Sequence, residues 1–166
     1  GSEPMAEAWL SSPRGRQYDR FLYAPPGARQ QARPEDYNGW RGFAVEAKEG
    51  DWSKNKDHIR QIVCGGNEEA FSWVMDWCAA LIQEPGRHAE SGLVLLGGQG
   101  TGKGHFADKM LGGLFDPHHY VTVIDRKRIF GDFNEVLSGR VLIFLDESTW
   151  GGDKRDAGII KGLVTG

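Results

Sequence analysis

The sequence predicts an α/β fold in which a parallel sheet is flanked by helices. Three short apolar runs, at residues 92–97, 120–124 and 140–147, have the length and continuous apolar character of strands buried on both faces. Helix-forming segments separate these runs, and the first of them is expected to begin near Gly102. Strands that alternate with helices along the chain are typical of a parallel sheet covered by helices.

The first 90 residues precede this sheet and divide into two parts. Residues 1–38 are polar, proline-rich and aperiodic, so we expect a flexible or loosely ordered arm. Residues 39–90 are expected to form a helical segment that packs on the core. Its first helix is predicted to begin at an N-cap on Ser53 and to stop at a pair of glycines, and its second helix to begin at an N-cap on Asn67 and to end before Pro85.

Composition and charge narrow the class of protein. The chain has 166 residues, enough for one domain with a small extra lobe. Its formal net charge of −3 argues against a uniformly basic binder of nucleic acid, but a local basic patch stays open, because the field that attracts a phosphate backbone is local. No apolar run reaches about 18 residues, so we expect no transmembrane helix and no membrane partner. Cys64 and Cys78 lack metal-ligand spacing and indicate reduced thiols in a cytoplasmic protein.

A glycine-rich loop follows the first apolar run. It reads GGQGTGKG over residues 97–104 and fits the pattern Gly-x-x-x-x-Gly-Lys. Glycines allow backbone conformations that turn successive N–H groups toward phosphate oxygens at a helix N-terminus, and a lysine adds positive charge at the outer phosphates. The residues expected to bind ATP are Gly98, Gln99, Gly100, Thr101, Gly102, Lys103, Gly104 and His105. The alternative is a glycine-rich turn between a strand and a helix, without a ligand.

An acidic pair ends the third apolar run. A strand of this kind would deliver Asp146 to the edge of the sheet next to the loop, where it is expected to hold Mg²⁺ directly or through water. Glu147 is expected to orient and polarise the attacking water, which would make Lys103 and Glu147 the catalytic residues. For the two acids alone, the favoured interpretation is that they cap the next element; together with the loop, the functional interpretation is favoured. The usual serine or threonine after the loop lysine is replaced by Gly104.

Several segments together resemble the superfamily 3 helicase module of phage and plasmid primase-helicases, which is related to the poxvirus primase-helicase. The matching segments, within residues 38–166, are WRGFA, DWCAALIQEPG, GGQGTGKG, GDFNEVLSGRVLIFLDESTWGGDK and IIKGLVTG. The resemblance implies an AAA+-like P-loop NTPase fold, with residues 91–166 as the ATPase core. In that family the loop often ends Gly-Lys-Gly, so Gly104 is a family variant, and Thr101, Ser148 or a water could complete the magnesium shell.

The resemblance also implies a function and partners. It implies an ATP-dependent DNA helicase or translocase of a phage or mobile-element replication protein, with single-stranded DNA in the channel of a hexameric ring and a primase domain upstream. Candidate contacts to DNA phosphates are Lys154, Arg155 and Lys161, each of which could instead lie on a solvated surface. Asn134 could brace the site or cap a turn.

One departure from the family concerns the end of the core. The family places a further strand with a polar sensor residue, and an arginine that reaches the neighbouring site, after the region that ends here at Gly166. We therefore expect an incomplete core with an exposed apolar sheet edge, and weak or absent hydrolysis by this chain alone.

The residues alone leave two other functions open. A P-loop phosphotransferase acting on a small molecule would need an arginine-rich lid, which the sequence does not display. A non-hydrolysing assembly module would bind single strands in a salt-sensitive manner without ATPase activity. The adjacent histidines His118 and His119 have no partners at metal spacing and are expected in a surface turn.

Overall fold

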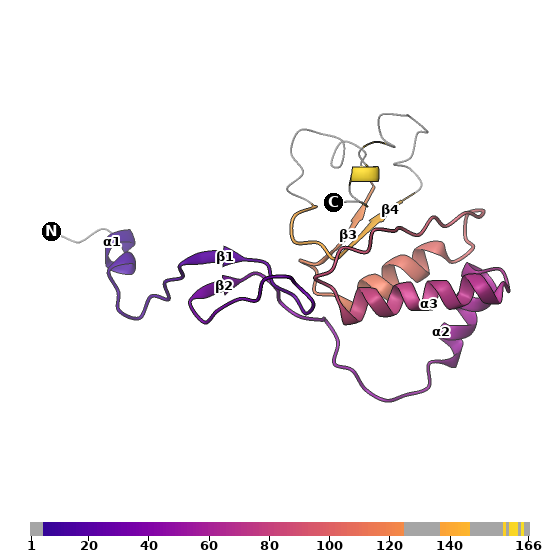
Figure 1. Ribbon diagram of the computed structural model, residues 1–166, viewed down its shortest axis with the longest axis horizontal. Coiled ribbons are helices and arrows are strands. Elements are labelled where there is room, and N and C mark those ends of the chain that lie inside the picture. The colour runs from indigo at the N-terminus through magenta and orange to yellow at the C-terminus, as the bar shows by residue number, and fades with distance from the viewer. Residues whose placement is uncertain (1–4, 125–136, 147–157, 159, 163, 165–166) are drawn as a thin grey trace.

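The computed structural model describes residues 5–124, 137–146, 158, 160–162 and 164 (Figure 1). In chain order the elements are α1 (Met5–Leu10), β1 (Arg20–Leu22), β2 (Asp36–Asn38), α2 (Ser53–His58), the π-helix η1 (Ile59–Val63), α3 (Glu68–Gln83), the π-helix η2 (His105–Leu111), the 3₁₀ turn η3 (Gly112–Leu114), β3 (Tyr120–Val123) and β4 (Leu142–Leu145). An arm made of α1, β1 and β2 extends to one side of the remaining elements, as Figure 1 shows. Within the described residues, no helix has the length and apolar character needed to cross a membrane.

Helix α3 organises the core. The side chain of Asn67 caps its first turn by accepting the Ala70 N–H at 2.9 Å, so the predicted N-cap is confirmed. One face of α3 packs against η1 and η2, and η2 runs beside it in Figure 1. The buried core residues are Ile59, Phe71, Val74, Cys78, Phe106 and Leu111. Each large apolar side chain buried here contributes about 1.5–3 kcal/mol. This packing holds in place the helix that follows the glycine-rich loop.

The helix before α3 differs from the prediction at its start. Ser53 is the first helical residue and not the N-cap; Trp52 holds the cap position without a side-chain bond. Asp51 instead accepts the Ser53 N–H at 2.9 Å, because a carboxylate two residues upstream satisfies the same orphan donor. The helix continues from α2 directly into η1 and ends, as predicted, at two glycines, Gly65 and Gly66, which adopt φ values of 59° and 76°.

Two of the three expected strands pair in parallel. Strand β3 lies beside β4 in a register that runs from Tyr120 opposite Leu142 to Val123 opposite Leu145. The connection between them includes residues 125–136, which lie outside the described part. The parallel pairing predicted for these two apolar runs is confirmed, and it brings the C-terminal ends of both strands to one edge.

The first apolar run behaves differently. Residues 92–97 belong to no sheet of the described structure, and the side chains along this segment alternate. Leu93 and Leu95 pack on the core, whereas Val94 is 82% exposed and Leu96 is 91% exposed. The expectation of a strand buried on both faces is therefore wrong. The physical reason is that the segment pairs with no strand of the described structure, and the core packs against only the face that carries Leu93 and Leu95.

His119 connects three parts of the fold. It is 1% exposed and stacks on Trp40 with a centroid distance of 4.4 Å. Its Nε2 accepts the Arg41 N–H at 2.8 Å, and its Nδ1 lies 3.0 Å from the carbonyl oxygen of Gly139. The expectation of a surface turn is therefore wrong for His119, although His118 is exposed. The error arose because residues 39–41 cover the ring, and no local pattern reports that contact.

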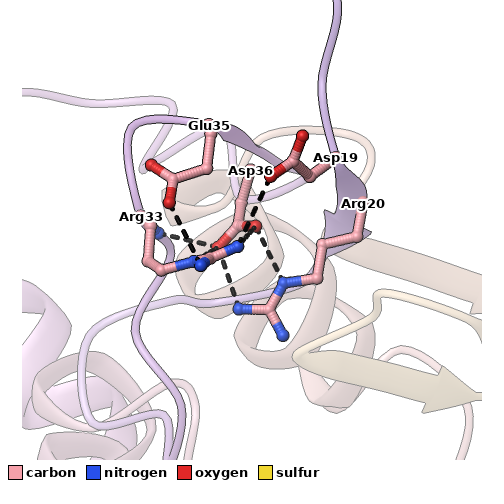
Figure 2. Close-up of polar contacts among 5 residues, drawn as sticks. All are labelled: Asp19, Arg20, Arg33, Glu35 and Asp36. Carbon is pink, nitrogen blue, oxygen red and sulfur yellow. Dashed lines mark hydrogen bonds and ion pairs between the residues drawn. The ribbon is translucent and has the colours of Figure 1, made fainter.

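The arm contains an ordered ion-pair cluster around Asp36 (Figure 2). The Asp36 carboxylate is fully buried and accepts hydrogen bonds from Arg20 Nε at 2.8 Å and Nη2 at 3.0 Å. Arg33 donates to it from its backbone N–H at 2.9 Å and from its guanidinium at 3.2 and 3.3 Å. These donors, Arg20 first, hold the pKa of Asp36 well below its usual range. The cluster joins the strand pair, because Arg20 is opposite Asp36 in the β1–β2 register.

Replacing Asp36 with asparagine is expected to lower the urea midpoint of unfolding at pH 7, because the folded state loses a charge held by two arginines. The folded-state pKa of Asp36 is lowered, so its contribution is complete above the ordinary aspartate pKa of about 3.9 and is lost as the pH falls below it. The difference between wild type and variant should therefore be constant from pH 7 to pH 5 and shrink in more acidic solution. Asp19→Asn is the matched control, since Asp19 is 69% exposed and 3.8 Å from Arg33. A difference that grew on acidification would contradict this assignment.

Candidate phosphate-binding loop

The glycine-rich loop connects the segment 92–97, which is exposed on one face, to η2. Gly100 and Gly102 adopt φ values of 79° and 87°, a region that residues with a Cβ rarely enter. Helical structure begins at Lys103, and the Phe106 N–H donates to the Gly102 carbonyl at 3.0 Å. The loop therefore ends in the first turn of a helix, as the sequence predicted. Backbone N–H groups of a first helical turn have no partner within the helix and can bind an anion.

The side chain of Lys103 lies back across the loop. Its ammonium group donates to the carbonyl oxygens of Gly97 at 2.7 Å and Gly98 at 2.8 Å, and lies 3.4 Å from Thr101 Oγ1. Thr101 Oγ1 in turn donates to the Gly98 carbonyl at 2.9 Å. A Cβ on Gly97 would lie 3.1 Å from Thr101 Oγ1, so the loop closes tightly around the lysine. This arrangement holds a positive charge within the loop.

The helix that follows the loop is tied to the sheet by a polar cluster. Tyr120 Oη donates to Asp108 Oδ1 at 3.0 Å and lies 2.8 Å from Thr122 Oγ1, which is 3.3 Å from the same carboxylate oxygen. Burial raises the pKa of Tyr120 to about 12, so the phenol remains a donor at neutral pH. The cluster fixes η2 against β3 and thereby orients the end of the loop.

Asp146 lies at the C-terminal end of β4, where its N–H donates to the Val123 carbonyl at 3.2 Å. A cleft of about 2060 Å³ is lined by the loop, by residues 141–146 and by Ile160 and Val164 of the tail. Ligand pockets typically measure about 300–1,000 Å³, so this cleft is large enough for a nucleotide. The structure brings Asp146 and the loop to the same cleft.

The other predicted site residues differ in their placement. Lys161 lies exposed in the helical part of the tail, between the cleft-lining Ile160 and Val164. The remaining candidates lie outside the described residues; they are Glu147, Asn134, Lys154, Arg155 and the possible magnesium ligand Ser148. Cys64 and Cys78 form no disulfide, and burial raises the pKa of the Cys78 thiol to about 11, which makes it a poor nucleophile.

Two residues that the sequence did not predict contact the loop. His58 at the end of α2 and Ile62 of η1 pack against Gly102; a Cβ there would lie 2.7 Å from His58 Cε1 and 3.7 Å from Ile62 Cγ2. No local sequence pattern identifies either residue as a loop contact, because neither the histidine nor the isoleucine belongs to a motif that predicts one. The contact arises from the packing of α2 and η1 against the loop.

The residues of the cleft fit a nucleotide phosphate with one magnesium ion. Positive-φ glycines, a lysine and a first helical turn are the groups that bind phosphate, and a single carboxylate is enough to hold Mg²⁺ when phosphate and water supply the other oxygens. In the described part of the chain, no group of three or more His, Cys, Asp or Glu side chains could hold a metal ion by itself.

Replacing Gly104 with serine is expected to tighten binding of Mg-ATP. Gly104 adopts φ −64°, and a Cβ there would meet nothing within 4 Å, so a serine side chain can be added without strain. Its hydroxyl would give the magnesium ion an additional oxygen, with an expected gain of about fivefold, or about 1 kcal/mol. Titration calorimetry with Mg-ATP and with ATP in EDTA checks this result.

The control for this change is Gly104→Ala, which adds the Cβ without the hydroxyl. The alanine variant should bind Mg-ATP like the wild type, and the serine variant should lose its advantage in EDTA. Equal affinities of the serine and alanine variants would show that position 104 does not face the metal ion.

The part of the chain that contains the site matches the model of one protein family. Residues 95–166 match the model of DUF5906, a family of unknown function. The matched region contains the loop, Lys103 and Asp146, and it begins after α3. No curated protein and no solved structure matches the chain.

Proposed function

We propose that this chain is the ATP-binding module of a DNA helicase or translocase from a phage or mobile-element replication protein. The observation that carries the proposal is the shared cleft of the phosphate loop and Asp146 at the C-terminal end of a parallel strand. Lys103 already lies within this loop, against the carbonyls of Gly97 and Gly98. The cleft is therefore lined by cationic and N–H groups of the loop and by one carboxylate, that of Asp146.

The roles of the residues follow from their chemistry. The loop N–H groups and Lys103 bind the phosphates, and Asp146 holds the magnesium ion. When bound, the magnesium ion neutralises charge on the phosphate oxygens. Glu147, which follows Asp146 in the chain, orients and polarises the water that attacks the terminal phosphate. Asn134 braces this site.

The DNA part of the proposal rests on the sequence resemblance. Single-stranded DNA passes through the channel of a hexameric ring of this chain, and Lys154, Arg155 and Lys161 contact its phosphates. The chain's net charge of −3 is compatible with this proposal, because the field that attracts a phosphate backbone is local. A primase domain precedes the module in the whole protein, which acts in the cytoplasm of a bacterial or phage-infected cell.

ATP hydrolysis by the longest available form of the protein, with and without single-stranded DNA, tests the proposal, because this chain alone is expected to hydrolyse ATP weakly or not at all. Protein concentrations are chosen to allow a ring to assemble. We expect an ATPase rate that rises with DNA and that is abolished by Lys103→Ala or Glu147→Gln, while Glu147→Gln retains ATP binding. An ATPase rate that does not change with DNA would overturn the proposal of a helicase or translocase and favour a phosphotransferase. ATP binding and DNA binding without hydrolysis would favour an assembly module, and absence of ATP binding would overturn the nucleotide site itself.

A further inference from the structure

The ring of His58 lies directly against the phosphate loop. A Cβ on Gly102 would lie 2.7 Å from His58 Cε1 and 3.1 Å from its Nε2. Real Cβ atoms essentially never come this close to other atoms, so the ring occupies the space that any other residue at position 102 would fill. Gly102 immediately precedes Lys103, which places the imidazole beside the cationic part of the loop.

The Nε2 atom of His58 is buried, and among the described residues it has no hydrogen-bond partner. A buried polar atom without a partner costs about 1–3 kcal/mol, and such an atom in a native structure calls for an explanation. The polar edge of the ring lies beside Gly102 and not in the solvent. An anion held by the loop is a partner that this position can reach when the loop opens around it.

A second imidazole adjoins the first. The ring of His105, which follows Gly104 in the chain, meets the His58 ring edge-on at a centroid distance of 5.3 Å and an angle of 81°. Both histidines also stand at the start of π-helical segments, since η1 begins directly after His58 and η2 begins at His105. Single π-helical turns are frequent at functional sites. The two neighbouring imidazoles therefore each mark the start of a helix of the same unusual geometry.

We propose that His58 is a phosphate-contact residue of this site and that its Nε2–H donates a hydrogen bond to the anion bound by the loop. The proposal rests on the nucleotide site of the proposed function and adds a residue from outside the glycine-rich motif. The contact forms when phosphate draws Lys103 away from the carbonyls of Gly97 and Gly98 and the loop opens. Hydrogen bonds to charged groups are about twice as strong as those between neutral groups, so a bond from His58 to phosphate would contribute substantially to binding.

Two substitutions separate donation from packing. His58→Phe keeps a flat ring against Gly102 but removes the donor, and His58→Gln keeps an N–H donor but removes the ring. Calorimetric titrations with ATP and with inorganic tripolyphosphate measure the affinity of each variant. His118→Phe is the matched control, because His118 is exposed and lies away from the loop.

The expected result is a loss of about tenfold in affinity for both ligands in His58→Phe, with His58→Gln within about threefold of wild type and His118→Phe unchanged. Wild-type affinity in His58→Phe overturns the proposal. An equal loss of affinity in both His58 variants also overturns it, because it would mean that the side chain acts by packing against the loop and not by donating a hydrogen bond. A loss for ATP without one for tripolyphosphate overturns the contact to phosphate. Lys103→Ala distinguishes failure of the His58 contact from failure of the nucleotide site. Wild-type binding of ATP in that variant would mean that the nucleotide site itself is wrong. Thermal unfolding of each variant confirms that binding is measured on folded protein.

Discussion

Gly102→Ala is expected to abolish nucleotide binding, with a loss of at least about 100-fold in ATP affinity, or about 2.7 kcal/mol. Two separate costs act at this position. The φ of 87° is unfavourable for a residue with a Cβ by about 1–2 kcal/mol. The new methyl group would also lie 2.7 Å from the His58 ring, and overpacking of this kind costs about 1–3 kcal/mol. The loop can relieve both costs only by changing the backbone conformation at Gly102, and with it the direction of the N–H groups expected to bind phosphate.

Two control glycines separate these costs. Gly100→Ala shares the positive φ, at 79°, but its Cβ would meet no atom within 4 Å, so it reports backbone strain alone. Gly113→Ala has neither feature and should bind ATP like the wild type. Calorimetry measures the affinities and urea unfolding the stabilities. If the clash with His58 is real, Gly102→Ala should destabilise the protein less in a His58→Ala background; additive effects would contradict the contact.

His119→Ala is expected to lower the free energy of unfolding by about 2–4 kcal/mol, because it leaves the Arg41 N–H and the Gly139 carbonyl without their buried partner. It also removes the ring that stacks on Trp40. Since Gly139 shortly precedes β4, the variant should also weaken the placement of Asp146 and lower the affinity for Mg-ATP more than for ATP in EDTA.

Urea unfolding followed by tryptophan fluorescence measures the effect, because Trp40 reports on the neighbourhood of the ring. The control is His118→Ala, one residue away and exposed, which should change the stability by no more than about 0.5 kcal/mol. Equal unfolding midpoints for the two variants would show that the buried bonds of His119 contribute little.

The parts of the fold that could be predicted are those with a local physical cause. The Asn67 cap and the apolar face of α3 depend on residues within a few positions of one another. Strands β3 and β4 were predicted from continuous apolar runs, and they pair in parallel. The segment 92–97 has the same character, yet Val94 and Leu96 are exposed. Its burial depends on what lies beside it, which an apolar run cannot report.

The sequence by itself determined the chemistry of the loop, because the glycines and Lys103 that make it are consecutive residues. It also determined that Asp146 follows an apolar strand, and the parallel pairing of that strand brings the carboxylate to the same cleft. Only the tertiary structure decided that His58 packs on Gly102 and that His119 is buried under Trp40. Each of these contacts joins segments far apart in the chain, so it depends on how the whole core packs and leaves no periodic or local trace in the sequence.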